Sequence, residues 1–152
     1  MIRLREARAD DEAFVVGLVP RFVEHGAADA HTPAEVIEGT SRVLRAALRS
    51  RPAHDVFLVA EDDAGERAGF LYAVTEHDFF TEEPYLHVSE IATARSGGGV
   101  GAALMDGAEA RAREYRYRFV TLNVVEQNAA ATRFYERRGY SPGHRHLVKR
   151  CD

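Results

Sequence analysis

The sequence has little of what several protein classes require. Cys151 is its only cysteine, so an internal disulfide cannot form and a zinc site built from several cysteines is excluded. No stretch approaches the roughly 18 to 20 consecutive apolar residues of a membrane-spanning helix, and residues 1–6 lack the apolar run of a signal peptide. We therefore expect a soluble, cytoplasmic protein that does not bind membranes.

No strong charge of one sign is present either. Lys and Arg number 20 against 24 Asp and Glu, which gives a net charge of −4 and a pI near 6.0. The basic residues are dispersed along the chain, so DNA and RNA are not expected partners. A hydrophobic fraction of 45% with 12 glycines and 5 prolines is typical of a globular chain and disfavours disorder, collagen and coiled coils. By its length, we expect residues 1–152 to form a single domain.

Hydrophobic periodicity predicts a strand and two helices at the start of the chain. Residues 2–7 alternate as a short strand, and Asp10 is placed to cap a helix that ends at His25 and Gly26. The segment Thr32-Pro33-Ala34-Glu35 has the pattern of a capping box with proline at the first helical position, and it predicts a second helix.

The remainder is expected to contain most of the strands. Turn residues between the expected strands 56–60 and 68–74 predict an antiparallel hairpin. Helices are expected after the glycines near residue 100 and from about Asn128 to Arg137. The resulting order indicates an α+β three-layer fold, with a mixed, mostly antiparallel central sheet, about four flanking helices and one crossover. The expected strands are 56–60, 68–74, 85–92, 119–125 and a weak final one at 144–150.

A glycine-rich segment joins an expected strand to an expected helix. Gly97 to Gly101 would expose backbone N–H groups beside the positive end of the helix dipole, which is an arrangement that binds phosphate, and a flexible turn is the alternative. No Gly-Lys-Ser/Thr follows, so the P-loop of nucleotide hydrolases is excluded. Gly97, Gly99 and Ala102 fit Gly-x-Gly-x-x-Ala, but a dinucleotide-binding fold has this pattern after its first strand and an acid about 20 residues later. Here a hairpin precedes the segment and Leu122 stands at that position.

Two motifs together carry a resemblance to a known family. Residues 123–140 read NVVEQNAAATRFYERRGY and resemble the strand-and-helix signature of the GNAT superfamily of acyl-CoA-dependent N-acyltransferases. Ser96 to Gly101 looks like the pyrophosphate loop of that family, Gln/Arg-x-x-Gly-x-Gly/Ala, with Ser96 at the usual Gln or Arg and Arg95 just before it. The resemblance covers the whole chain and is strongest from Val56 to Tyr140. The matching positions of the signature are Asn128, Ala131, Phe134, Tyr135, Glu136, Gly139 and Tyr140.

The resemblance implies an N-acetyltransferase with acetyl-CoA as co-substrate and no metal. The acetyl group would pass directly to a primary amine of a small molecule or a peptide N-terminus in a ternary complex, and a homodimer would be compatible with the family. Tyr135 would be the general acid at the CoA sulfur, Asn128 would contact the pantetheine arm, and backbone N–H groups near Ile91 to Thr93 would stabilise the oxyanion. The implied cofactor-binding residues are Ile91, Ala92, Thr93, Arg95, Ser96, Gly97, Gly98, Gly99, Val100, Gly101, Ala102, Asn128 and Tyr135.

The identity of the general base stays open. An alkyl amine with a pKa near 10 is almost entirely protonated at neutral pH, so a base must remove its proton before attack. The strand before the glycines offers Glu90 and His87, and the third possibility is neither of them. On a regular strand the two side chains would point to opposite faces, but a bulge of the kind that family members carry would re-aim one of them.

The acceptor is not specified by these motifs. By resemblance it would be held by residues 21–40 and 76–85, whose charged side chains would suit a cationic amine or simply face solvent. A non-catalytic acyl-CoA-binding regulatory module is the alternative function, because it would need the glycines but no proton chemistry at Tyr135. A nucleotide-binding domain is a third interpretation. The charged residues concerned are Glu24, His25, Asp29, His31, Asp78, Glu82 and Glu83.

Overall fold

The computed structural model describes residues 1–28 and 30–152, and in these residues five strands form one mixed sheet. The strands follow each other in the order β1-β2-β3-β4-β5, and all neighbours are antiparallel except β5, which runs parallel to β4. The predicted α+β architecture with one crossover is confirmed. The strands are β1 (Arg3–Glu6), β2 (Val56–Glu61), β3 (Arg67–His77), β4 (Pro84–Thr93) and β5 (Val120–Leu122).

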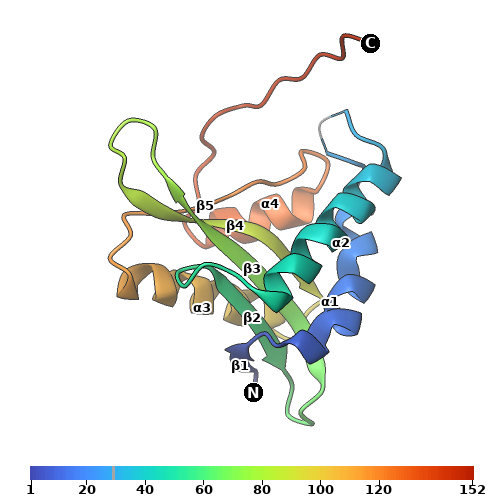
Figure 1. Ribbon diagram of the computed structural model, residues 1–152, viewed down its shortest axis with the longest axis vertical. Coiled ribbons are helices and arrows are strands. Elements are labelled where there is room, and N and C mark those ends of the chain that lie inside the picture. The colour runs from blue at the N-terminus through green and yellow to red at the C-terminus, as the bar shows by residue number, and fades with distance from the viewer. Residues whose placement is uncertain (29) are drawn as a thin grey trace.

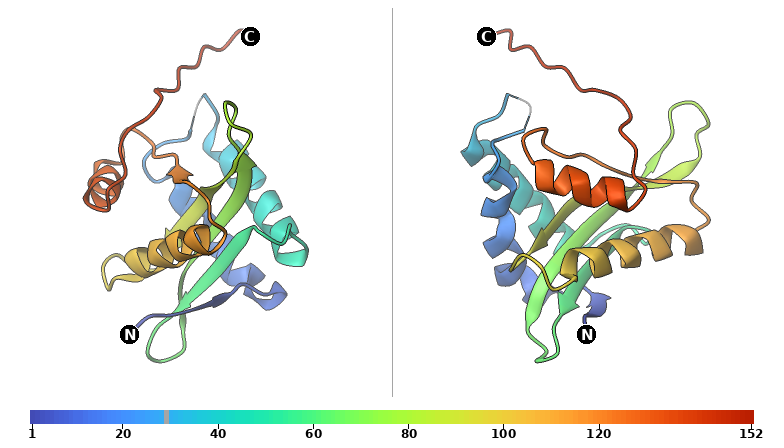
Figure 2. Two further views of the ribbon diagram at one scale, coloured as in Figure 1. Left: turned by 90° about the vertical axis from the view of Figure 1, so that its left-hand side faces the viewer. Right: turned by 180° about the vertical axis from the view of Figure 1, so that it is seen from behind.

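Helices cover both faces of the sheet (Figure 1, Figure 2). One face packs against α1 (Glu12–Leu18), α2 (Pro33–Arg49) and the 3-10 helix η2 (Val19–Val23). The other packs against α3 (Val100–Glu114) and α4 (Ala129–Arg137). Two apolar clusters therefore sandwich the sheet, as the alternation of buried side chains along β2 and β3 requires. No helix in the described part of the chain is long and apolar enough to cross a membrane.

The predicted capping box of α2 is confirmed. Thr32 Oγ1 accepts a hydrogen bond from the Glu35 backbone N at 3.2 Å, and Glu35 Oε2 accepts one from the Thr32 backbone N at 2.8 Å. Both bonds satisfy donors that the first helical turn leaves without intrahelical partners.

The start of the preceding helix differs from the prediction. Asp10 does not cap it; Asp11 is the carboxylate that is fully buried, after the 3-10 turn η1 (Ala9–Asp11). The helix was also expected to run to His25 and Gly26, but α1 ends at Leu18 and η2 follows. Pro20 explains the change, because a proline has no N–H for the α-helical hydrogen bond.

Asp11 joins three segments of the chain. It accepts hydrogen bonds from Arg5 at 2.8 and 2.9 Å, from Arg67 Nε at 2.6 Å and from the Arg8 backbone N at 2.7 Å. Burial alone would raise the pKa of Asp11, but these donors outweigh it and hold the pKa well below its usual range. The cluster therefore ties β1 and β3 to the beginning of α1.

The C-terminal segment departs from the prediction of a final strand. Residues 141–152 have no regular structure and extend away from the sheet (Figure 1, Figure 2). In the segment 144–150, Leu147 and Val148 are the apolar residues, and Leu147 is 84% exposed, so no alternating face is available for burial. β5 is also shorter than the predicted 119–125, because its pairing with β4 is limited to Leu86–Val88.

Candidate active site

A bulge in β4 brings the two candidate bases to the same face of the sheet. Tyr72 of β3 pairs with Glu90, whereas Ala73 pairs with Val88, so Ser89 is an extra residue without an opposite number. Val74, the next residue of β3, pairs with His87. Tyr72 and Val74 both belong to the cluster beneath α1 and α2, and cross-strand partners share a face. Glu90 and His87 therefore lie on the α1/α2 face, where a regular strand would have separated them.

Beyond the bulge, β4 and β5 diverge. The β4–β5 ladder covers Leu86 to Val88, while β4 remains paired with β3 as far as Thr93. The Ala94 backbone N donates to the Ala68 oxygen at 2.8 Å, so alternation along the strand turns the N–H groups of Ile91 and Thr93 away from β3. This open edge of β4 presents backbone donors of the kind that stabilise an oxyanion.

Glu90 is the site carboxyl whose acidity the fold changes most. Its side chain is half-buried, and burial raises its pKa to about 7, against a smaller opposing effect of a hydrogen bond from the Ser89 side chain. A carboxyl group with such a pKa exchanges a proton close to neutral pH, which is what a general base requires.

His87 is held by a contact across the sheet. Its Nδ1 lies 2.7 Å from Thr121 Oγ1 on β5, at the register position directly opposite. This hydrogen bond uses one ring nitrogen and connects the two strands just before they diverge. Through this bond, His87 helps to hold β4 and β5 together near the end of their pairing.

The glycine loop has the backbone that the sequence predicted. Gly97, Gly98 and Gly99 have φ values of +81°, +70° and +74°, in the left-handed region that side chains disfavour. No atom lies within 4 Å of where their Cβ atoms would be, so backbone conformation and not space requires glycine here. The Ala103 N donates to the Gly99 oxygen at 2.9 Å as α3 begins. The backbone N–H groups just before Ala103 come too early in the helix to have an acceptor within it.

The end of β4, the start of α3 and α4 converge at this loop. A Cβ on Gly101 would lie 3.8 Å from Phe134 Cζ and 3.9 Å from Thr93 Cγ2, which is ordinary packing distance. Gly69 on β3 is more constrained, because its Cβ would lie 2.8 Å from the Ala92 oxygen and 2.9 Å from Val100 Cγ1. The absence of a side chain at Gly69 lets α3 begin directly against the sheet.

Tyr135 lies on α4, and Asn128 stands at the N-terminal cap of the same helix. The Tyr135 ring makes edge contacts with Phe134 and Tyr140 at centroid distances of 5.1 and 5.8 Å, and burial raises its pKa. Its hydroxyl forms no hydrogen bond with any described residue. Asn128 Oδ1 accepts from the Ala131 N at 3.1 Å, so Asn128 caps α4 with its oxygen. The amide N–H donors of Asn128 are not needed for this cap.

Arg21 is a residue of this region that the sequence reasoning missed. It lies on η2, and its Nη2 donates to the Ala94 backbone oxygen at 2.9 Å, where β4 leads into the glycine loop. The two residues are 73 positions apart, and no local pattern around Arg21 indicates the contact.

The charged residues expected near the acceptor have mostly local roles. Asp78 Oδ1 accepts from the backbone N of Phe80 and of Thr81 at 3.1 and 2.9 Å, so it shapes the β3–β4 turn. Glu83 forms an ion pair with Arg118 at 2.8 Å. His31 Nδ1 lies 2.9 Å from the Ala28 oxygen. Glu24, His25 and Glu82 are exposed, and Asp29 lies outside the described residues.

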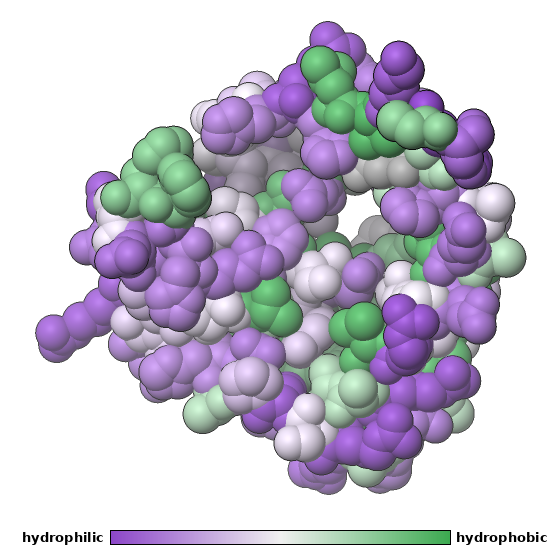
Figure 3. All heavy atoms as spheres, turned by 45° about the horizontal axis from the view of Figure 1, so that its top comes forward, coloured by the Kyte–Doolittle hydropathy of each residue, from purple (hydrophilic) through white to green (hydrophobic). Residues whose placement is uncertain are grey.

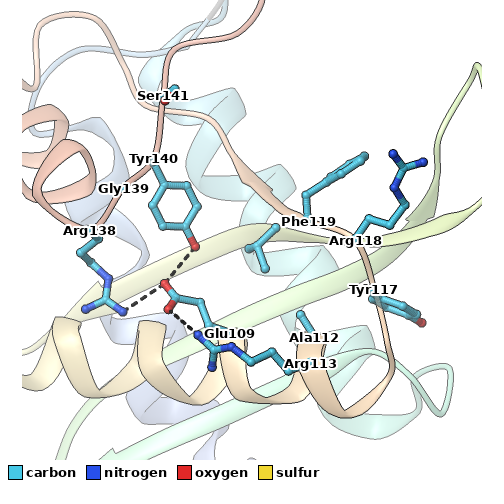
Figure 4. Close-up of a pocket in the computed structure, with 11 residues that line it drawn as sticks. Glu109, Ala112, Arg113, Tyr117, Arg118, Phe119, Arg138, Gly139, Tyr140 and Ser141 are labelled. Atoms are coloured by element: carbon cyan, nitrogen blue, oxygen red, sulfur yellow. Dashed lines mark hydrogen bonds and ion pairs between the residues drawn. The ribbon is translucent and has the colours of Figure 1, made fainter.

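A separate cleft of about 470 Å³ lies between α3 and the residues that follow α4 (Figure 4). Glu109 is at its centre and accepts hydrogen bonds from Arg138 at 3.0 Å and from the Tyr140 hydroxyl at 3.1 Å. None of the predicted site residues lines this cleft, and its polar contacts serve to attach α4 to α3.

When the top of Figure 1 is tilted forward, the surface shows a hollow with a largely hydrophilic rim (Figure 3).

Comparison with known proteins agrees with this geometry. Residues 23–140 match the sequence model of the Acetyltransferase (GNAT) family. The chain belongs to the GNAT family. Members of this family are acetyltransferases, and acyl transfer from acetyl-CoA is their general chemistry. Among the described residues, no group of three or more His, Cys, Asp or Glu could hold a metal ion.

Individual relatives of this GNAT chain are distant. Mycothiol acetyltransferase from Salinispora tropica is 29% identical over 150 residues, which are 96% of this chain and 46% of that protein, so the chain spans about half of its relative. A GCN5-related N-acetyltransferase from Ralstonia eutropha superposes with a TM-score of 0.79 at 20% identity, covering 100% of both chains. An aminoglycoside N-acetyltransferase in complex with CoA has a TM-score of 0.71 at 15% identity, covering 99% of this chain and 94% of that one. At these identities, the solved structures establish the shared fold.

Proposed function

We propose that this chain transfers an acetyl group from acetyl-CoA to a primary amine of a small molecule or a peptide N-terminus, by direct attack in a ternary complex. One observation carries the proposal. Glu90, with its pKa raised to about 7, lies on the same strand as an unpaired backbone edge that leads directly into the glycine loop. Base, oxyanion donors and phosphate cradle thus follow one another along β4.

The residues present fit acetyl-CoA. The left-handed glycines leave open space beside an exposed helix N-terminus, which suits the pyrophosphate. Arg95, Ser96 and the backbone as far as Ala102 make up this loop and the start of α3. Ile91 to Thr93 offer the pantetheine arm an unpaired strand edge. Asn128 keeps amide donors for the same arm. Bound acetyl-CoA supplies an activated thioester.

Three groups of the chain then act on the reacting atoms. Glu90 removes a proton from the acceptor ammonium, directly or through a water molecule. The N–H of Ile91, turned toward the open edge, donates to the oxygen on which negative charge develops. Tyr135 gives its proton to the sulfur as the C–S bond breaks, and it recovers a proton from the nitrogen, which loses its second proton once the C–N bond has formed. Burial keeps the phenol protonated at neutral pH, and the pKa of a free thiol is about 8.5.

We favour Glu90 over His87 as the base. Both lie on the α1/α2 face, but the hydrogen bond of His87 to Thr121 holds its ring toward β5. The β3 partner of Glu90, Tyr72, is two residues nearer to the glycine-loop end of the sheet than the partner of His87, so Glu90 lies closer to the loop. Its raised pKa also suits a general base.

Thermal unfolding with acetyl-CoA and CoA, followed by a thiol-release assay on amines and peptides, tests the proposal. A ligand at 100 times its Kd adds about 2.7 kcal/mol to stability. For a domain of this size we expect the unfolding midpoint to rise by about 5 to 10 °C. No shift at millimolar ligand, or binding without turnover of any amine in a broad panel, would contradict the proposed activity.

A further inference from the structure

Arg21 is distinguished from the other half-buried arginines because it has no acidic partner among residues 1–28 and 30–152. Arg5 pairs with Asp11, Arg51 and Arg111 both pair with Glu6, and Arg138 pairs with Asp106 and Glu109. Within residues 1–28 and 30–152, Arg21 forms no ion pair, and its single hydrogen bond is to the Ala94 oxygen. The half-buried arginines are Arg5, Arg21, Arg51, Arg111 and Arg138.

The unpaired charge implies an anionic ligand. Partial burial of a guanidinium costs solvation energy, and proteins normally offset it with a carboxylate or another anion. The guanidinium has five N–H donors, of which the Ala94 oxygen uses one. The remaining donors form a planar fork whose geometry matches two phosphate oxygens.

The packing of η2 fixes this fork beside the glycine loop. Phe22 makes an edge contact with Phe70 at a centroid distance of 6.3 Å, and Phe70 pairs with Ala92 on β4. Ala94 lies two residues after Ala92. Its backbone N bonds to the Ala68 oxygen at the end of the sheet, and its backbone oxygen accepts the hydrogen bond from Arg21. The exposed loop residues 95–99 follow immediately.

The loop itself supplies only partial positive charge. Its backbone N–H groups and the dipole of α3 amount to roughly half an elementary charge, whereas a pyrophosphate carries two negative charges. Ser96 is neutral at the position that resembles a Gln or Arg in the family, and Arg95 is exposed to solvent. Arg21 carries a full positive charge near the loop. Because its side chain is half-buried, solvent screens this charge less than that of an exposed arginine.

We propose that Arg21 is a cofactor-binding residue that holds the pyrophosphate of acetyl-CoA and replaces the charge missing at Ser96. This inference rests on the proposed function, because the pyrophosphate is assigned to the glycine loop there. Arg21 comes from η2, outside both motifs, so it connects the helices that cover the acceptor side to the cofactor.

The test compares Arg21→Gln with the unaltered protein in binding three ligands. Glutamine keeps N–H donors on a shorter side chain and removes the charge. The Kd of CoA and of 3′-dephospho-CoA, which retain the pyrophosphate, is expected to rise about 10- to 100-fold, because hydrogen bonds to charged groups are the strong ones. The Kd of pantetheine, which has no pyrophosphate, is expected to stay unchanged. Arg45→Gln, an exposed arginine of α2, is the control for the change in net charge.

Several results would overturn the inference. An unchanged Kd for CoA, alone or with a raised KM for the acceptor amine, would show that Arg21 does not hold the pyrophosphate. An equal loss of pantetheine binding would mean that Arg21 only shapes the end of β4. Because the readout is a ratio between ligands, it remains valid if the variant is less stable. Failure of the unaltered protein to bind CoA would overturn the proposed function as well, whereas the other results leave that function intact.

Discussion

The role of general base that we propose for Glu90 depends on the surroundings of its carboxyl group. Its carboxyl group has a pKa of about 7 because the α1/α2 face buries it, with little compensation from hydrogen bonding. A general base must be deprotonated to act, so kcat/KM should rise with pH up to about 7 and then level off. His87 is the other candidate base on the same face of the sheet. The pH profile therefore has to be combined with substitutions.

Replacing Glu90 by glutamine should lower kcat about 100- to 10,000-fold, which is the usual contribution of general base catalysis. The Kd of CoA should not change, and the acidic limb of the kcat/KM profile should disappear. His87→Asn is the matched control, because its amide can retain the bond to Thr121 without the imidazole ring. Steady-state kinetics from pH 5.5 to 9 measure both variants. Loss of the limb in His87→Asn and its retention in Glu90→Gln would transfer the role to His87.

Tyr135→Phe separates proton donation from packing. Phenylalanine preserves the edge contacts with Phe134 and Tyr140, so folding and CoA binding should remain unchanged. Loss of the proton donor should reduce kcat about 100-fold or more in a thiol-release assay. Full activity in this variant would leave Tyr135 as a core aromatic residue.

At the scale of an element, the loop before α3 depends on an uninterrupted left-handed backbone. In Gly98→Ala, the side chain has open space, but the φ of +70° costs about 1 to 2 kcal/mol for a residue with a Cβ. The Kd of CoA should therefore rise about 5- to 30-fold if the loop relaxes away from its bound shape.

Gly17→Ala is the control for this loop substitution. Gly17 lies in α1, also has open space around it and is not in the left-handed region, so alanine should stabilise the helix by about 0.5 to 1 kcal/mol. Thermal unfolding and calorimetric titration with CoA distinguish the two variants. Equal CoA affinity in Gly98→Ala and the unaltered protein would contradict a role for the loop conformation.

At the scale of the whole molecule, Asp11 joins the edge of the sheet to the first helices. Asp11→Asn leaves Arg5 and Arg67 without their shared carboxylate and should lower the free energy of unfolding by about 3 to 5 kcal/mol, measured by denaturant titration. The pKa of Asp11 is lowered on folding, so its contribution is complete above about pH 4 and is lost as the pH falls below that value.

The neighbouring carboxylate provides the control for this prediction. Asp10 is 73% exposed and reaches Arg67 only at 4.0 Å, so Asp10→Asn should change the free energy of unfolding by less than about 0.5 kcal/mol. A similar effect of both substitutions would mean that the buried carboxylate is not what stabilises this junction.

Features that depend only on neighbouring residues could be predicted from the amino-acid sequence. The capping box of Thr32 and Glu35, the glycines of the loop and the motif around Tyr135 are local patterns, because a helix cap, a left-handed turn and a helix face each involve only a few consecutive residues. They were sufficient for the family and for most of the element order. The start of α1 was misassigned by one residue, since burial and not local capping selected Asp11 over Asp10.

Which side chains meet at the candidate site depends on the packing of distant segments against one another. The bulge at Ser89 is a property of two paired strands, so the face that Glu90 shares with His87 could not be derived from the periodicity of β4 alone. The contact between Arg21 and Ala94 crosses 73 positions of sequence and depends on how η2 packs on the sheet. The irregular backbone of residues 144–150 belongs with these, because a strand forms only where a partner edge and a face to bury exist together.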